Sequence, residues 1–234
     1  MNKLEPINQT DLFGLEKYIN ELISLYDKGK YPNKILLSGL KGTGKSTLAY
    51  HFINYVLSQR ERYCYDKINF RIDSRSQIFK TTVNKSNPNL NIIDITNEKK
   101  SIDINQIREL ILQLNKSSFN NKPRFVLIDN IEFLNTNSIN ALLKVLEEPN
   151  YNIHFILINN NKKILSTLLS RCLDFKISLS NAESLKITDK LLSGNFKEKI
   201  NIDLINYYFT PGKVYRLIKF AELYQYDLST FDLK

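Results

Sequence analysis

Short apolar runs alternate with amphipathic segments through most of this chain. In each of five runs, hydrophobic residues follow one another with few polar interruptions, as in a strand buried on both faces of a sheet. Between the runs, hydrophobic residues recur at every third or fourth position, which is the spacing of one helix face. The predicted strands are residues 33–39, 89–95, 124–129, 153–158 and 172–178, and the predicted helices are residues 12–27, 45–59, 101–114, 136–148 and 162–170. This alternation predicts an α/β fold, a doubly wound parallel sheet covered by helices on both faces.

The pattern changes in two places. Residues 60–89 are polar, basic and without periodicity, so this segment is predicted to be mostly a loop. Beyond about Ser180 only helical periodicity remains. We therefore expect an α/β domain over residues 1–178 and a small all-helical lid domain over residues 179–234.

Two helix ends carry local signals. Asp103 followed three positions later by Gln106 predicts a capping box at the start of the helix over residues 101–114. Pro149 is expected to stop the helix over residues 136–148.

Composition narrows the class of protein. The chain of 234 residues is 42% hydrophobic and carries a net charge of +9, which fits either a polyanionic partner such as nucleic acid or a solvated, lysine-rich surface. Part of the excess lies in residues 60–89, with seven basic and three acidic residues. No apolar run reaches the length of a membrane helix, and the N-terminus lacks the apolar core of a signal peptide, so a cytoplasmic protein is expected. Cys64 and Cys172 form no disulfide framework and no zinc motif.

A phosphate-binding motif follows the first predicted strand. The segment GLKGTGKS at residues 39–46 fits G-x-x-x-x-G-K-[ST] in full and precedes a predicted helix, which makes a chance glycine-rich turn the weaker interpretation. In such a loop the backbone N–H groups and the helix N-terminus face the phosphates. Lys45 is expected to reach the terminal phosphates of ATP, and the Ser46 hydroxyl to bind Mg²⁺. The residues predicted to hold the nucleotide here are Gly39, Lys41, Gly42, Thr43, Gly44, Lys45, Ser46 and Thr47.

Asp129 ends the third predicted strand, in the segment FVLIDNIEF. At this place a carboxylate can hold the Mg²⁺ shell, although an aspartate that caps a turn is the alternative. ATPases of this construction often have glutamate next, whereas this chain has Asn130. Asparagine cannot act as a general base, but it can hydrogen-bond a water molecule. Glu132, two residues further on, is expected to point to another face.

Two further motifs identify a family. NALLKVLEEP at residues 140–149 and LLSRC at residues 168–172 resemble the clamp-loader branch of the AAA+ ATPases, and within it the delta prime subunits of bacterial DNA polymerase III. The resemblance extends from about Leu12 to Tyr226. It implies a five-stranded AAA+ sheet with a helical lid packed across an ATP site. It also implies a hetero-oligomer with gamma/tau and delta subunits, which uses ATP to open a sliding clamp and place it on primed DNA.

The resemblance assigns roles to individual positions. Arg171 would be an arginine finger, on a face opposite the chain's own site, that acts on ATP held by a neighbouring subunit. A structural ion pair with Asp174 or a glutamate is the alternative. Asn159 or Asn160 would be the polar sensor of the γ-phosphate, and both positions remain open. Leu12, Phe13 and Gly14 would contact the base, with a core role for the first two as the alternative.

The sequence also departs from the family. Gly212 stands where the sensing arginine of the lid is expected, and Lys213 and Arg216 are possible replacements. A four-cysteine zinc module is missing. The collar domain is expected to be absent because the chain ends where it would begin, and both a fragment and an unusually short family member fit this ending. Lys144 is a candidate for the DNA path or a subunit seam, with a solvated helix face as the alternative.

Together these features predict a stator subunit that binds ATP·Mg²⁺ weakly or statically and donates Arg171 to an active partner. An active gamma/tau-like ATPase and a DNA-binding scaffold with a vestigial nucleotide site are the main alternatives. A small-molecule P-loop kinase is disfavoured, because it has no use for the Ser-Arg-Cys motif or the lid. Turnover of ATP by the isolated chain distinguishes the stator from the ATPase.

Overall fold

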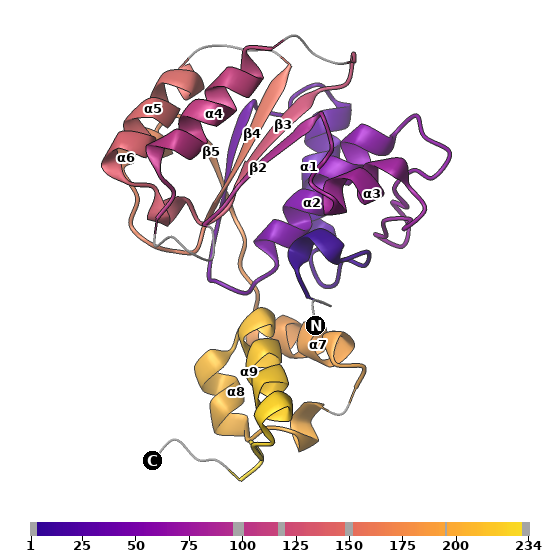
Figure 1. Ribbon diagram of the computed structural model, residues 1–234. Helices are drawn as coiled ribbons and strands as arrows, with labels where there is room; N and C mark the ends of the chain where they lie inside the picture. The colour runs from indigo at the N-terminus through magenta and orange to yellow at the C-terminus, as the bar shows by residue number, and fades with distance from the viewer. Residues whose placement is uncertain (1–3, 96–100, 117–119, 148–151, 195, 231–234) are drawn as a thin grey trace.

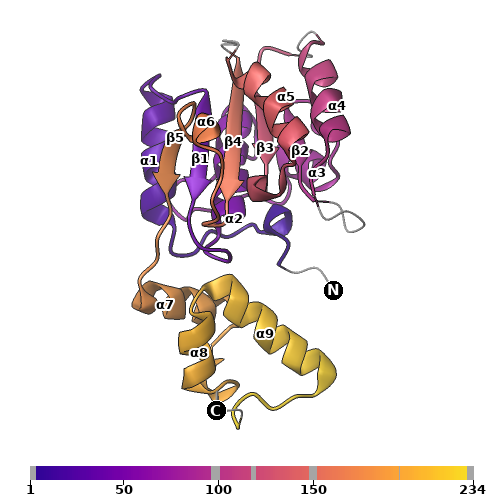
Figure 2. The ribbon, with the colours of Figure 1, turned by 90° about the vertical axis from the view of Figure 1, so that its left-hand side faces the viewer.

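A computed structural model of the chain describes residues 4–95, 101–116, 120–147, 152–194 and 196–230. Its centre is a five-stranded sheet in the order β2-β3-β4-β1-β5, with every neighbouring pair parallel (Figures 1 and 2). The strands are β1 (Lys34–Ser38), β2 (Leu90–Ile93), β3 (Arg124–Ile128), β4 (Ile153–Asn159) and β5 (Leu173–Lys176). The predicted five-stranded parallel sheet is therefore confirmed.

Helices cover both faces of the sheet (Figure 1). Because successive side chains of a strand point to opposite faces, Ile35 and Leu37 of β1 belong to one hydrophobic core and Leu36 to the other. The first core is completed by α1 (Glu16–Asp27), α2 (Lys45–Ser58) and α3 (Gln77–Val83), and the second by α4 (Ile104–Leu114), α5 (Thr136–Glu147) and α6 (Ser166–Leu169). The packing of both cores against the sheet fixes the positions of the carboxyl ends of the strands.

The lid consists of α7 (Asn181–Leu191), α8 (Ile202–Tyr208) and α9 (Pro211–Tyr224), with a short 3₁₀ helix, η3 (Phe196–Glu198). These helices bury a hydrophobic cluster of their own. In both views they lie beyond the edge of the sheet where the strands end (Figures 1 and 2). A separate domain over residues 179–234 stays a prediction that this packing favours.

Local signals at the helix ends account for several element boundaries. The capping box of α4 is confirmed, with the Asp103 side chain accepting from the Gln106 amide and the Gln106 side chain accepting from the Asp103 amide. A second one starts α7, where Ser180 and Glu183 make the same exchange. Pro149 lies outside the described residues.

Two expectations about elements need correction. Residues 60–89, predicted as mostly loop, contain α3, which Ser76 caps by accepting from the Phe79 amide. The helix predicted over residues 162–170 is confined to Ser166–Leu169. Both segments lack a long amphipathic repeat, and their helices are only seven and four residues long. Within the described part of the chain, no helix has the length and hydrophobicity needed to cross a bilayer.

Candidate functional site

The phosphate loop connects β1 to α2 at the carboxyl edge of the sheet. Gly42 and Gly44 have φ angles of 92° and 89°, in the left-handed region that favours glycine. Gly39 is needed for a different reason, because a Cβ atom there would lie 2.2 Å from the carbonyl oxygen of Ile177. The loop backbone therefore requires the glycines of the motif.

Lys45 is buried at the first position of α2, with 3% of its surface exposed. Its Nζ donates to the carbonyl oxygens of Gly39 and Leu40, at 2.9 and 2.7 Å. Burial lowers the pKa of Lys45 from 10.5 to about 8, although the negative charges of Asp129 and Glu132 oppose this shift. The site therefore holds a cation whose charge depends on pH near neutrality.

Asp129 follows β3 and faces the phosphate loop. Its Oδ2 accepts a 2.5 Å hydrogen bond from the Ser46 hydroxyl, which places two oxygen ligands side by side. Burial raises the pKa of Asp129 above its ordinary range, while the hydrogen bond from Ser46 works against this shift. Hydroxyl and carboxylate oxygens are the ligands that Mg²⁺ prefers, so this pair fits the predicted metal role.

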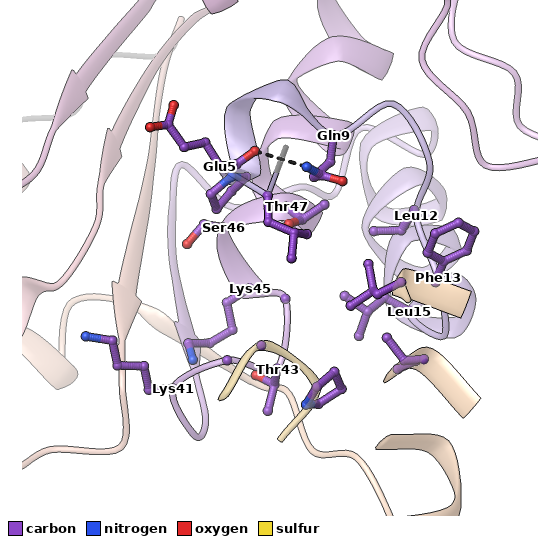
Figure 3. Close-up of a pocket in the computed structure, with 18 of the residues that line it drawn as sticks. Glu5, Gln9, Leu12, Phe13, Leu15, Lys41, Thr43, Lys45, Ser46 and Thr47 are labelled. Atoms are coloured by element: carbon purple, nitrogen blue, oxygen red, sulfur yellow. Dashed lines mark hydrogen bonds between the residues drawn. The ribbon is translucent and has the colours of Figure 1, made fainter. Parts of the chain in front are cut away.

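A cavity of about 410 Å³ opens beside the loop (Figure 3). Lys45 and Ser46 lie at one part of it, and Leu12 and Phe13 at another (Figure 3). Its lining from the sheet domain includes Glu5, Gln9, Asp11, Leu12, Phe13, Leu15, Lys41, Gly42, Thr43, Gly44, Lys45, Ser46, Thr47, Asp129, Asn130 and Asn160. Seven of the eight residues predicted from the loop motif line it, whereas Gly39 acts through the carbonyl oxygen that Lys45 binds.

The apolar end of the cavity fits the predicted base contact in part. Leu12 and Phe13 line it, and Leu12 is also buried in the first core, so Leu12 has a core role and its contact with the base stays a prediction. Gly14 instead packs against the lid, where a Cβ atom would lie 2.4 Å from Ile187 Cδ1. Glu5 and Gln9, which the sequence analysis did not consider, also line the cavity, and Gln9 Nε2 donates to the Glu5 carbonyl oxygen at 3.4 Å (Figure 3).

The two asparagines that end β4 and follow it are separated by the structure. Asn160 lines the cavity. The Asn159 side chain turns to the next loop. Its Nδ2 donates to the Lys162 carbonyl oxygen at 2.8 Å, and its Oδ1 accepts from the Lys162 backbone amide at 3.1 Å. Of the two sensor candidates, Asn160 is therefore the one that borders the cavity.

Glu132, two residues after Asn130, was expected to point to another face, and this expectation is wrong. The 3₁₀ turn η2 (Ile131–Phe133) brings its carboxylate back to the site, where it accepts from Asn160 Nδ2 at 3.1 Å and from the Asn160 amide at 3.3 Å. Asn130 makes this turn possible with a φ of 56°, which asparagine tolerates better than most residues. Its Nδ2 donates to Asp94 Oδ1 at 2.7 Å.

Asp94 was missed by the sequence analysis, although a signal was present. It follows β2 as Asp129 follows β3, and these neighbouring parallel strands end at the same edge of the sheet. Two strand-end aspartates of this kind are expected to lie close together, and Asp94 indeed contributes to the raised pKa of Asp129.

The lid closes one side of the cavity. The Gly212 amide donates to the Gly42 carbonyl oxygen at 2.9 Å, and the Thr210 hydroxyl donates to the Lys41 carbonyl oxygen at 2.9 Å. Arg216 lines the cavity, and its Nε donates to the Gly212 carbonyl oxygen at 3.1 Å. Of the two possible replacements for the sensing arginine, Arg216 thus borders the cavity and Lys213 is not among its lining residues.

Arg171 lies outside the cavity, between α6 and β5. Its guanidinium pairs with Glu147, with Nη2 and Oε1 2.6 Å apart, and also donates to the Thr167 carbonyl oxygen. The ion pair that we named as the alternative role of Arg171 is therefore present with Glu147. Asp174 instead accepts a hydrogen bond from the Ser38 hydroxyl. The Arg171 side chain stays 32% exposed, so the ion pair does not bury it fully.

A second hollow, of about 550 Å³, lies between α4 and α5. Arg108 and Lys144 line it from opposite helices, and both are exposed. In the basic segment over residues 60–89, by contrast, Lys67, Arg71 and Arg75 form ion pairs with aspartates of this chain. The hollow therefore brings together two exposed basic residues from neighbouring helices.

Comparison with known proteins finds similarity to subunits of DNA polymerase III. Residues 14–181 match the model of a family described as DNA polymerase III, delta subunit. A gamma/tau subunit of DNA polymerase III from Mycoplasma genitalium is 30% identical over 86% of this chain and 32% of its own length. A delta' subunit from Buchnera aphidicola subsp. Baizongia pistaciae is 40% identical over 33% of this chain and 23% of its own length.

Among solved structures, the Holliday junction branch migration motor RuvB of Thermotoga maritima has a similar fold. It matches with a TM-score of 0.52 and 15% identity, over 95% of this chain and 69% of the RuvB chain. The chain spans about a third to a half of the length of the first curated relatives that it matches.

Proposed function

We propose that this chain, which belongs to the DNA polymerase III delta subunit family of clamp-loader AAA+ proteins, holds ATP·Mg²⁺ statically and supplies Arg171 to a neighbouring ATPase subunit. One observation carries the proposal: most of the residues predicted to hold a nucleotide line one cavity, whereas residue 130 in that cavity is an asparagine and not an acid. The chain would then act as a stator of the delta prime type.

The cavity suits a nucleotide in size and chemistry. Its volume of about 410 Å³ lies in the usual range for small-molecule sites. Lys45 and the loop amides would bind the phosphates, Ser46 and Asp129 the magnesium ion, and Leu12 and Phe13 the base. Bound ATP·Mg²⁺ would supply the phosphoanhydride, while these residues hold and orient it.

Hydrolysis within the chain itself is disfavoured by Asn130. Its side chain cannot take a proton from water, because an amide is not a base at neutral pH. The lid adds to this, since Gly212 offers only backbone to the loop. We therefore expect slow turnover by the isolated chain.

Arg171 is suited to act on another subunit. It lies outside the chain's own cavity, it is partly exposed, and Leu165, Leu169 and Leu173 beside it are exposed to 47%, 40% and 49%. Apolar side chains around an accessible cation are typical of a surface that a protein partner covers. In this arrangement the guanidinium would neutralise charge on the phosphoryl group of the neighbour's ATP.

The partners follow from the family. The chain would assemble with gamma/tau and delta subunits, act on the sliding clamp and face primed DNA. Arg108 and Lys144 in the hollow between α4 and α5 would contact phosphates of that DNA, which their exposure and charge support.

An active gamma/tau-like ATPase is the second candidate. Two observations favour it: the 30% identity to a gamma/tau subunit over most of this chain, and the Glu132 carboxylate that reaches the site beside Asn160. A DNA-binding scaffold with a vestigial nucleotide site is the third candidate, and it rests on the basic hollow alone.

ATP affinity and steady-state ATP hydrolysis of the purified chain, alone and mixed with a gamma/tau-type ATPase subunit, test these candidates. The stator is supported if the chain alone binds ATP without turnover and the mixture hydrolyses it. Turnover by the chain alone at about 1 per second or more, the lower end of the range typical of enzymes, would establish the second candidate. Salt-dependent binding of primed DNA without any affinity for nucleotide would establish the third.

A further inference from the structure

Four side chains at the carboxyl edge of the sheet form a continuous chain of hydrogen bonds. Asn130 Nδ2 donates to Asp94 Oδ1 at 2.7 Å, and Asn160 Nδ2 donates to Asn130 Oδ1 at 2.8 Å. Asn160 Nδ2 also donates to Glu132 Oε1 at 3.1 Å. This series of hydrogen bonds thus has a carboxylate at each end and two side-chain amides in the middle.

The carboxylates fix the orientation of both amides. An ionised carboxylate only accepts hydrogen bonds, so Asp94 requires the nitrogen of Asn130 and Glu132 requires the nitrogen of Asn160. With its nitrogen turned to Asp94, Asn130 presents its oxygen to Asn160, which again requires the Asn160 nitrogen. Reversal of either amide would set two acceptors against each other.

This arrangement occupies both amide protons of Asn160. One is donated to Asn130 and the other to Glu132, while Asn160 Oδ1 accepts no hydrogen bond from the described residues. Asn160 borders the cavity. A phosphate oxygen accepts hydrogen bonds and needs a donor. Asn160 Oδ1 is itself an acceptor, so it cannot hold a phosphate oxygen.

Asn159 does not compensate for this loss. Its side-chain nitrogen donates one proton to the Lys162 carbonyl oxygen, and its side-chain oxygen accepts from the Lys162 backbone amide. Asn159 is also not among the residues that line the cavity, so Asn160 is the asparagine at this end of β4 that a γ-phosphate could reach.

We propose that Glu132 makes the site insensitive to the γ-phosphate, so that ATP and ADP bind with similar affinity. Glu132 is then a specificity-determining residue, which acts through Asn160. The inference rests on the proposed nucleotide binding and adds to it the reason why the bound nucleotide does not signal its state. Such a site holds a nucleotide as a structural ligand.

The test compares the dissociation constants of ADP and a non-hydrolysable ATP analogue, each with Mg²⁺, by calorimetry on the full chain. For the wild type we expect the two constants to agree within about threefold. Glu132→Ala releases one amide proton of Asn160, and a hydrogen bond to a charged phosphate oxygen is expected to favour the ATP analogue about tenfold. Glu132→Gln keeps an acceptor for Asn160 Nδ2 and should retain the wild-type ratio.

Glu109→Ala serves as the matched control, because Glu109 is an exposed glutamate of α4. A wild-type preference above tenfold for the ATP analogue would overturn the inference, and so would an unchanged ratio in Glu132→Ala. If neither nucleotide binds to the wild type, the proposed function fails, and the inference fails with it. Binding of both with an unexpected ratio contradicts the inference alone.

Discussion

The amide nitrogen of Gly212 in the lid donates a 2.9 Å hydrogen bond to the carbonyl oxygen of Gly42 in the phosphate loop. The two backbones approach so closely that a Cβ atom on residue 212 would lie 3.0 Å from Gly42 Cα. The family resemblance leads us to expect an arginine at this position, but any side chain there would meet the backbone of Gly42. Glycine here lets the lid dock on the loop backbone to backbone.

Gly212→Ala should weaken nucleotide binding. The new methyl group presses on backbone atoms that cannot rotate away, and overpacking of this kind costs about 1–3 kcal/mol. We expect the affinity for ATP to fall roughly tenfold in calorimetry. Gly29→Ala controls for a loss of stability alone: its φ of 65° strains an alanine, but Gly29 does not line the cavity, so the affinity for ATP should not change. Tighter binding in Gly212→Arg would show that the position still accepts the family's arginine.

Nucleotide affinity should decline in alkaline solution because of Lys45. The pKa of its buried ammonium group is lowered to about 8, so the free site loses its cation above this pH. Bound phosphates need that charge, and the affinity is therefore expected to fall about tenfold for each pH unit above 8. Titrations at pH 7, 8 and 9 check this. Lys45→Met should bind weakly without this slope, and a wild-type affinity that stays constant to pH 9 would contradict the assignment.

Asp129→Asn should stabilise the free protein while it weakens Mg²⁺-dependent binding. Burial raises the pKa of Asp129, so the folded state binds its proton more readily than the unfolded state does. Stability then falls as the pH rises through the ordinary aspartate range near 4 and above, and the variant escapes this loss. We expect a higher melting temperature for the variant at pH 7 and a shrinking difference towards pH 4. A lower melting temperature at pH 7 would mean that the Ser46 contact outweighs the burial.

Asn130→Glu alone should fail to create an active ATPase. The new carboxylate would lie beside Asp94, which now accepts from Asn130 Nδ2 at 2.7 Å, and the two negative charges repel each other. In the double variant Asp94→Asn/Asn130→Glu an amide faces the carboxylate. Because a positioned base contributes about 10²–10⁴ in rate, we expect the double variant to exceed Asn130→Glu at least tenfold in steady-state turnover. Equal rates would exclude Asp94 as the obstacle.

Arg171→Ala should leave ATP binding by this chain unchanged and lower hydrolysis by the mixture with a gamma/tau-type subunit. Loss of an arginine finger costs roughly 10³ or more in rate. Glu147→Ala is the matched control, because it removes the other half of the same exposed ion pair, which contributes at most about 1 kcal/mol to stability. This control should keep the rate of the mixture. Equal loss in both variants would assign Arg171 a structural role only.

The sequence by itself determined the α/β class, the five strands and the phosphate loop. These features depend on local patterns: unbroken apolar runs, helical periodicity and a motif whose glycines and lysine are contiguous. Ser46 and Asp129 were also predictable. Ser46 is the last residue of the phosphate-loop motif, and Asp129 comes at the end of a buried strand. Family motifs outside this site, in residues 140–149 and 168–172, were contiguous as well.

Only the tertiary structure decided which polar groups meet at the edge of the sheet. Asn159 and Asn160 are neighbours in sequence, but one turns to Lys162 and the other borders the cavity. Glu132 was predicted to point to another face, whereas the left-handed Asn130 and the turn after it bring its carboxylate to Asn160.

The same holds for the lid. A glycine at position 212 appears in the sequence as a missing arginine, and nothing local shows that it fits against Gly42. Contacts of this kind join segments that the chain separates by many residues, so they depend on how the sheet and the lid pack. The physical reason is general: a local pattern fixes how a segment folds, while the long-range packing of segments fixes which donors and acceptors share a site.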